Sequence, residues 1–421
     1  MEISTHRIPG LVLTDHRFAV PLDYAEPDSA TIDVFARAIA SPTTPPDRPW
    51  LVFFQGGPGF ASPRPTEPSG WIGRAISDYR VLLLDQRGTG LSTPVVPETL
   101  VRLGSPQAQA EYLRHFRADN IVRDAEAIRR ELIGDDTWSV LGQSFGGFCV
   151  TRYLSSAPEG LREAMITGGL PPLGGHPDDF YRATYQRMLD RNERYYERYP
   201  ADRSVVRRIA ERLAGGDVSL PDGSPLTIRR FQQLGMLLGM GDGFERLHFG
   251  MQEAFAADGD DLSSPFLRQV YAEQPFETNP LYALIHEACV CDGTASRWSA
   301  DRVRPEFPQF DDPANLTAEA IYPWMFEDYA ALRPFAETAD LLADVTWPEL
   351  YEPEVLAANT VQSAAAVYYD DMYVERTFSE ATARAIGDMR VWVTNEYQHN
   401  GLRTDGATIL DRLIAMVRGE R

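Results

Sequence analysis

The stretch Trp138-Ser-Val-Leu-Gly-Gln-Ser-Phe-Gly-Gly-Phe-Cys149 places a small polar residue, Ser144, between two glycines directly after an apolar run. The run 138–141 is typical of a strand buried on both faces of a sheet, and residues 147–154 can continue as a helix. The pattern G-x-S-x-G therefore falls in a sharp strand-to-helix turn, where backbone segments approach too closely for most side chains. An ordinary glycine-rich turn is the simpler alternative. The flanking strand and helix favour Ser144 as a nucleophile.

Strand and helix patterns alternate on both sides of this turn. Largely apolar runs predict buried strands, and apolar residues at helical spacing, as over 119–132, predict helices between them. Because strands that alternate with helices form parallel sheets, the sequence predicts an α/β fold. The expected strands are 17–22, 31–38, 50–54, 79–84, 138–141, 162–167, 364–369 and 389–394, and the expected helices are 119–132, 379–386 and 407–418.

The segment between residues 171 and 341 has a helical pattern instead, rich in aromatic and charged residues. We therefore expect one catalytic α/β domain, formed by residues 1–170 and 342–421, with a mostly parallel sheet and helices on both faces. A helical cap domain over residues 171–341 is inserted into it. The helices expected in the cap include 178–199, 204–213, 280–290 and 318–332.

The composition argues against several classes of protein. Hydrophobic residues make up 43% of the 421 residues, enough for a sizeable core, and the net charge of −21 disfavours nucleic acid as a partner. This charge either favours solubility or attracts cationic substrates. Three cysteines form no disulfide framework, the N-terminus lacks a signal-peptide pattern, and no apolar run reaches the roughly 20 residues of a membrane span. We expect a cytoplasmic protein without a membrane partner.

A nucleophilic serine needs a histidine as its base and an acid that orients the histidine. Enzymes with this kind of turn carry them in the chain order serine, acid, histidine. Of the four histidines after Ser144, three lie at the entry to the cap or within it, namely His176, His248 and His286. His399 instead follows the last expected strand, at the edge of the sheet where the nucleophile lies. We therefore expect His399 to be the base.

The acid should follow the preceding strand, where Tyr368-Tyr-Asp-Asp371 offers two adjacent aspartates. Neighbouring residues of a strand point to opposite faces, so only one of them can face His399. We expect Asp371, the residue that leaves the strand, and Asp370 is the alternative.

A tetrahedral intermediate also needs backbone N–H donors at its oxyanion. Phe145, directly after the nucleophile, supplies one. The loop Gln55-Gly-Gly-Pro-Gly59 follows the strand 50–54, and its glycines allow the main chain to approach a substrate. We expect Gly57 to supply the second donor.

Four motifs together resemble the prolyl aminopeptidases (proline iminopeptidases) of the larger bacterial type, which are α/β-hydrolases. The motifs are QGGPGF from Gln55, DQRGTGLS from Asp85, GQSFGGF from Gly142 and NEYQHNGLR from Asn395, and the resemblance covers almost the whole chain. It implies a serine peptidase that releases an N-terminal proline from peptides through an acyl-enzyme. We expect no cofactor and no metal, because no cluster of His, Asp and Glu has the spacing of metal ligands.

The resemblance also implies cap carboxylates that bind the free amino group of the substrate. Glu287 and Glu327 lie amid apolar residues, where an unpaired carboxylate is costly and a cationic amine would compensate for it. Each could instead form an internal salt bridge with a cap arginine. Glu396 is a third candidate, because it lies three residues before His399.

Two other functions remain open. The same fold could serve an esterase, or a peptidase that releases other amino acids or tripeptides, because contacts with the cap decide the substrate. The chain could also be a non-catalytic, hydrolase-like binding protein. The complete set of Ser144, Asp371 and His399 argues against that second alternative.

Overall fold

A nine-stranded sheet runs through the molecule in the computed structural model, which describes residues 1–26, 28, 30–257, 259–274 and 276–421. Its order is β1-β2-β3-β5-β4-β6-β7-β8-β9. The first three strands pair antiparallel with their neighbours, and the other six pair in parallel. The strands are β1 (Glu2–Ile8), β2 (Leu11–Pro21), β3 (Thr31–Ala40), β4 (Trp50–Phe54), β5 (Arg80–Asp85), β6 (Trp138–Gln143), β7 (Leu161–Thr167), β8 (Gln362–Tyr368) and β9 (Met389–Thr394).

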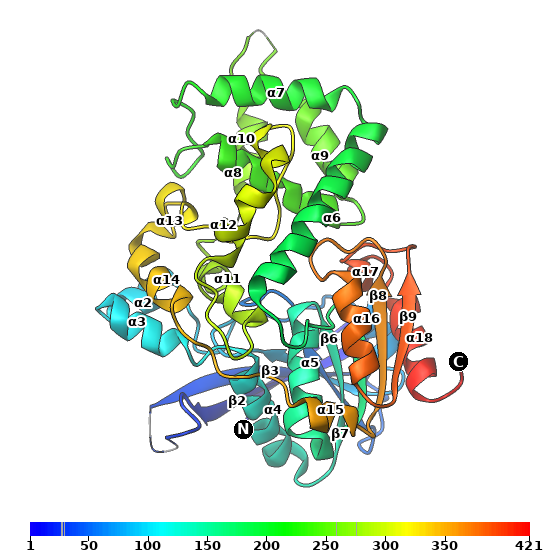
Figure 1. Cartoon of the computed structure of the whole chain (residues 1–421). Coiled ribbons are helices and arrows are strands. Elements are labelled where there is room, and N and C mark those ends of the chain that lie inside the picture. Colours follow the sequence, from blue (N-terminus) through cyan, green and yellow to red (C-terminus); the bar gives the residue numbers. More distant parts are fainter. Residues whose placement is uncertain (27, 29, 258, 275) are drawn as a thin grey trace.

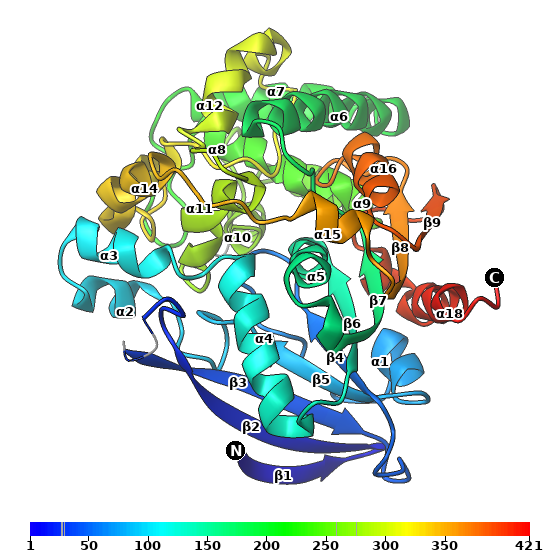
Figure 2. The same cartoon turned by 60° about the horizontal axis from the view of Figure 1, so that its bottom comes forward.

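Helices cover both faces of this sheet (Figure 2). In β4, Leu51 and Phe53 face the layer that contains α1 and α18, whereas Val52 and Phe54 face α4 and α5. Burial on both faces explains why the parallel strands are continuous apolar runs. The helices of these layers are α1 (Gly70–Ala75), α4 (Ala118–Ile133), α5 (Phe145–Ser156), α15 (Pro353–Ala357), α16 (Arg376–Ala385), α17 (Gly401–Thr404) and α18 (Gly406–Val417).

A helical cap, which we define as the elements α6 to α14, lies over one edge of the sheet (Figure 1). It has a hydrophobic core of its own, to which Leu100 of α2 and Leu113 of α3 also contribute. The expected domain division at residues 171 and 341 stays a prediction. The cap contains α6 (Pro177–Arg198), α7 (Asp202–Leu213), α8 (Ile228–Gln232), η2 (Gln233–Gly239), α9 (Gly243–Gln252), α10 (Ser264–Ala272), α11 (Pro280–Ile285), η3 (Glu287–Val290), α12 (Ser299–Val303), α13 (Met325–Asp328) and α14 (Ala336–Ala343), and α2 (Pro97–Arg102) and α3 (Pro106–Leu113) pack against it.

Two elements differ from the expectation. The strand β1 was not expected, because its side chains are almost all exposed and leave no hydrophobic pattern. The helix expected over 318–332 is wrong, since only the four residues of α13 are helical there. Glu319 has a φ of 37°, outside the helical region, and Pro323 disfavours helical geometry in the residue before it.

Within the described ranges, none of the helices is both long enough and apolar enough to cross a bilayer.

Candidate active site

Ser144 lies in the sharp turn between β6 and α5, as its sequence pattern predicts. Its φ of 55° and ψ of −126° are unusual for a residue with a side chain, and such strain is typical of functional turns. Two glycines make the turn possible. A Cβ on Gly142 would overlap the carbonyl oxygen of Gly146, and a Cβ on Gly146 would overlap the carbonyl oxygen of Phe54 in the neighbouring strand β4.

His399 lies between Ser144 and Asp371. Its Nε2 is 2.9 Å from Ser144 Oγ, and its Nδ1 is 2.7 Å from Asp371 Oδ2. The other oxygen of Asp371 accepts N–H groups from Tyr373 at 2.9 Å and Val374 at 3.0 Å, which fixes the carboxylate. The ring of Tyr373 lies edge-on to the imidazole, with 4.7 Å between the ring centroids. The structure therefore brings together the three residues that the sequence selected, in the geometry of a nucleophile, a base and an orienting acid.

Asp370 points away from this group. Its carboxylate forms an ion pair of 2.6 Å with Arg194 of α6, so it ties the cap to the loop after β8. Both aspartates lie in this loop rather than in the strand, which ends at Tyr368.

Burial tends to lower the pKa of His399, but the charge and hydrogen bond of Asp371 outweigh it, so the pKa lies above its ordinary value. Asp371 stabilises the imidazolium form, as it must if His399 takes a proton.

A cavity next to Ser144 is closed on its far side by the cap. Gly57 and Phe145, the two expected oxyanion donors, both line it. The full lining consists of Gly57, Pro58, Ser144, Phe145, Phe148, Phe180, His286, Cys289, Val290, Glu319, Tyr373 and Val374.

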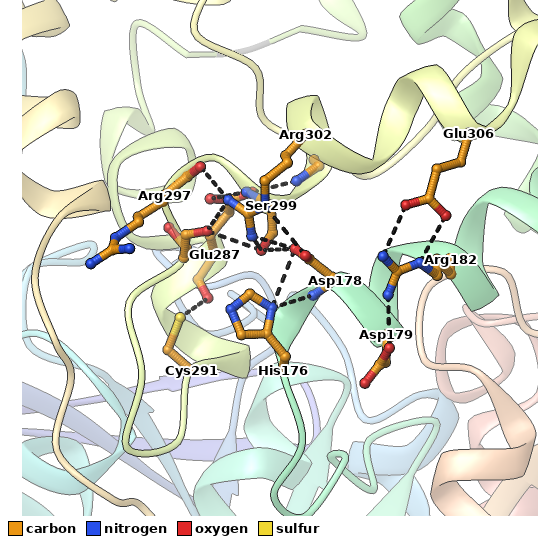
Figure 3. A network of polar contacts seen from close by, with 12 residues as sticks. His176, Asp178, Asp179, Arg182, Glu287, Cys291, Arg297, Ser299, Arg302 and Glu306 are labelled. Carbon is orange, nitrogen blue, oxygen red and sulfur yellow. Dashed lines mark hydrogen bonds and ion pairs between the residues drawn. The ribbon is translucent and has the colours of Figure 1, made fainter.

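Glu287 does not line this cavity, contrary to the expectation that it meets the substrate. Its carboxylate accepts the N–H groups of Ala300 at 2.9 Å and Ser299 at 3.3 Å at the start of α12. Figure 3 shows it within a network of polar contacts that also contains Asp178 and Arg302. Burial raises the pKa of Glu287, and the N–H groups of α12 oppose that effect. The carboxylate is thus hydrogen-bonded within the cap.

Glu327 and Glu396 also lie away from the cavity. The side chain of Glu327 is 73% exposed and pairs with Arg229 at 3.2 Å, which is the salt-bridge alternative that the sequence left open. Glu396 lines a separate groove with Arg74 and Trp392, which shares no lining residue with the cavity at Ser144. The three carboxylates expected from the sequence are therefore not brought to Ser144.

The carboxylate that the structure does place there is Glu319, which the sequence pattern did not single out. Its Oε1 accepts a hydrogen bond from Tyr282 at 3.1 Å and lies 3.9 Å from His286 Nε2. Its side chain is only 16% exposed, and in the part of the chain that the structure describes no arginine pairs with it. The one signal in the sequence was a lone acid in Leu316-Thr-Ala-Glu-Ala320, without an arginine nearby.

Comparisons with known proteins agree with this geometry. Residues 49–249 match the family model of the alpha/beta hydrolase fold. The chain is 49% identical over 419 residues to a proline iminopeptidase of Aeromonas sobria, with 98% of each chain covered. It is 37% identical to the proline iminopeptidase aneH of Aspergillus aculeatus, with 98% of this chain and 95% of the relative covered. The crystal structure of esterase E22, at a TM-score of 0.51 and 11% identity, covers 96% of this chain and is fully covered itself, and it supports the fold alone.

The sheet order, the turn at Ser144 and the matching family model define an α/β-hydrolase. Within that class, the two relatives are similar over nearly their whole length. The chain belongs to the proline iminopeptidase family.

Proposed function

We propose that this protein is a serine peptidase that releases an N-terminal proline from peptides through an acyl-enzyme. One observation carries the proposal. A single cavity contains Ser144, in contact with His399, and the carboxylate of Glu319, which pairs with no arginine among the described residues. A substrate with a carbonyl group and a nearby cation matches both ends of this cavity. The names of the two relatives support proline as the residue that is released.

The chemistry follows from the contacts around His399. Its Nε2 takes the proton of Ser144 Oγ as the oxygen attacks the carbonyl carbon of the substrate, while Nδ1–H donates to Asp371. The N–H groups of Gly57 and Phe145 stabilise the oxyanion, and losing one such donor costs about 3–4 kcal/mol in the barrier. His399 then gives its proton to the leaving amine. Water attacks the prolyl ester on Ser144 and releases proline by the same proton transfers.

Glu319 recognises the free amino group of the substrate by binding its positive charge. A buried carboxylate without a cationic partner carries a desolvation cost that a substrate ammonium offsets with a charge-assisted hydrogen bond. Acetylation of the N-terminus removes this charge and adds bulk at the same point. A prolyl amide is therefore a substrate, whereas its N-acetyl form is not.

We expect Glu319→Gln to lower kcat/KM for a prolyl amide, because the uncharged amide cannot neutralise the ammonium. The expected loss of transition-state stabilisation is about 2–5 kcal/mol. Hydrolysis of a small ester without an amine should change much less. Glu327→Gln is the matched control, since this exposed cap glutamate pairs with Arg229 and should leave both activities unchanged. Equal losses of amide and ester hydrolysis in Glu319→Gln would show that Glu319 is structural.

The raised pKa of His399 sets the expected acid limb of activity. The base must be neutral, so activity is lost as the pH falls through this pKa. We expect the reaction of Ser144 with an amine-free probe to fall with a midpoint above pH 6.5, the ordinary value for histidine, with a slope of one proton. A midpoint below pH 6.5, measured from the rate of labelling by a fluorophosphonate, would contradict the role of Asp371.

A further inference from the structure

A second nitrogen-containing group faces the carboxylate in the cavity. His286 Nε2 lies 3.9 Å from Glu319 Oε1, which is too long for a direct hydrogen bond. One ammonium nitrogen that lies about 2.9 Å from each of these atoms fits between them, since both acceptors then lie at normal hydrogen-bond length. At this separation, one nitrogen beside the line between the two atoms can form a hydrogen bond with both His286 and Glu319.

The other ring nitrogen of His286, Nδ1, faces helix α6 of the cap. His286 Nδ1 lies 3.5 Å from Tyr181 Oη of α6, and the ring of Tyr282 lies 4.9 Å from the imidazole. If Nδ1 carries the proton and donates it to Tyr181, then Nε2 is free to accept an N–H group from the cavity.

The charges around His286 come mainly from carboxylates. Burial raises the pKa values of Tyr181, Tyr282 and Tyr373 well above their ordinary range, so these phenols stay neutral near neutral pH. Burial also raises the pKa of the Cys289 thiol, which lines the cavity. The acidic groups that face His286 are Glu319 across the cavity and the neighbouring Glu287, whose carboxylate is bonded to the start of α12.

We propose that His286, in its neutral form, is the second acceptor for the amino group of the substrate, and that its protonated form excludes this group. A secondary ammonium such as that of proline has two N–H groups, and Glu319 and His286 accept one each. Once protonated, His286 cannot accept, and it becomes the cationic partner of Glu319 instead. Protonation of His286 at low pH therefore prevents binding of the amino group, whether or not His399 is protonated. This inference rests on the proposed function.

The proposal predicts two protons in the acid limb of wild-type kcat/KM for a prolyl amide. Where both histidines become protonated, kcat/KM falls by about 100-fold per pH unit, whereas labelling of Ser144 by a fluorophosphonate, which has no amine, falls by about tenfold. His286→Gln keeps an acceptor but does not titrate, so it should bring the amide slope down to one proton. His286→Leu removes the acceptor and should lower kcat/KM at pH 8 by about 10- to 100-fold, which the Gln variant should largely restore.

His248→Gln is the matched control, because this cap histidine pairs with Asp202 and does not line the cavity. Its amide slope should stay at two protons. Fluorophosphonate labelling at pH 8 checks that each variant retains an intact Ser144 and His399.

A one-proton limb for the wild-type amide reaction would overturn the proposal. A two-proton limb that persists in His286→Gln would also overturn it, because the second proton would then bind to a group other than His286. Normal labelling without any cleavage of the prolyl amide at pH 8 is a different result, which would refute the proposed function itself.

Discussion

Replacing Ser144 by alanine is expected to lower kcat for a prolyl amide by about 10⁶-fold, the loss typical of removing a serine nucleophile. The reason is that Ser144 Oγ is the only atom of this side chain that contacts His399 Nε2, and alanine lacks it. Alanine fits the turn as well as serine does, because both have a Cβ and meet the same strain at a φ of 55°. The fold should therefore persist while turnover is lost, as measured by steady-state kinetics and thermal unfolding.

Ser156→Ala is the matched control for this variant. Ser156 is exposed at the end of the same helix, where its Oγ donates to the carbonyl oxygen of Arg152 at 2.9 Å. This change should leave kcat within about twofold, as expected for surface substitutions. Activity of purified Ser144→Ala within tenfold of the wild type, in a preparation free of host peptidases, would remove Ser144 from the mechanism.

The second large effect is expected from Asp371→Asn, which should lower kcat by about 10⁴-fold. Asparagine can still accept the N–H groups of Tyr373 and Val374 through its oxygen, so its amide nitrogen is turned towards His399. That nitrogen donates to Nδ1 and forces the proton onto Nε2. His399 then cannot accept the proton of Ser144.

Asp370→Asn separates this effect from a general disturbance of the loop. The ion pair of Asp370 with Arg194 lies near the surface, where such pairs contribute about 0–1 kcal/mol. We expect less than a tenfold change in kcat for this variant. If Asp370→Asn lost more activity than Asp371→Asn at pH 8, the orienting acid would have to be reassigned.

The residues at the sheet could be predicted because the fold itself places them. Ser144 and His399 follow strands whose apolar runs are visible in the sequence, and loops at the same ends of parallel strands meet at one edge. The choice of Asp371 over Asp370 also agrees with the geometry, although both residues lie beyond the strand.

The cap could not be predicted to the same depth, because tertiary packing decides which of its carboxylates reaches the cavity. Glu287 has the apolar neighbours that suggest burial, and it is buried. The N–H groups that donate hydrogen bonds to its carboxylate, however, lie 12 and 13 residues further along the chain. Glu319 reaches the cavity through a left-handed backbone conformation that no helical or strand pattern indicates. The helix expected over 318–332 did not indicate that Glu319 reaches the cavity, because in a regular helix the direction of each side chain follows from the helical period.

The alternatives on the same fold differ in what they require at the amino end of the substrate. An esterase needs no amine, and a peptidase that releases tripeptides would have the amino group three residues from the cleaved bond. In this structure Glu319 and Ser144 line the same small cavity, which favours an amine on the residue that is cleaved. A non-catalytic binding protein does not need the contacts of His399 with Ser144 and Asp371.

The central claim is tested most directly by incubating the wild-type protein with a peptide that begins with proline, and with its N-acetylated form, and identifying the products by mass spectrometry. We predict free proline and a peptide shortened by one residue from the first substrate, and no cleavage of the second. Release of a tripeptide, or equal cleavage of the acetylated peptide, would contradict a peptidase that reads the free amine of an N-terminal proline.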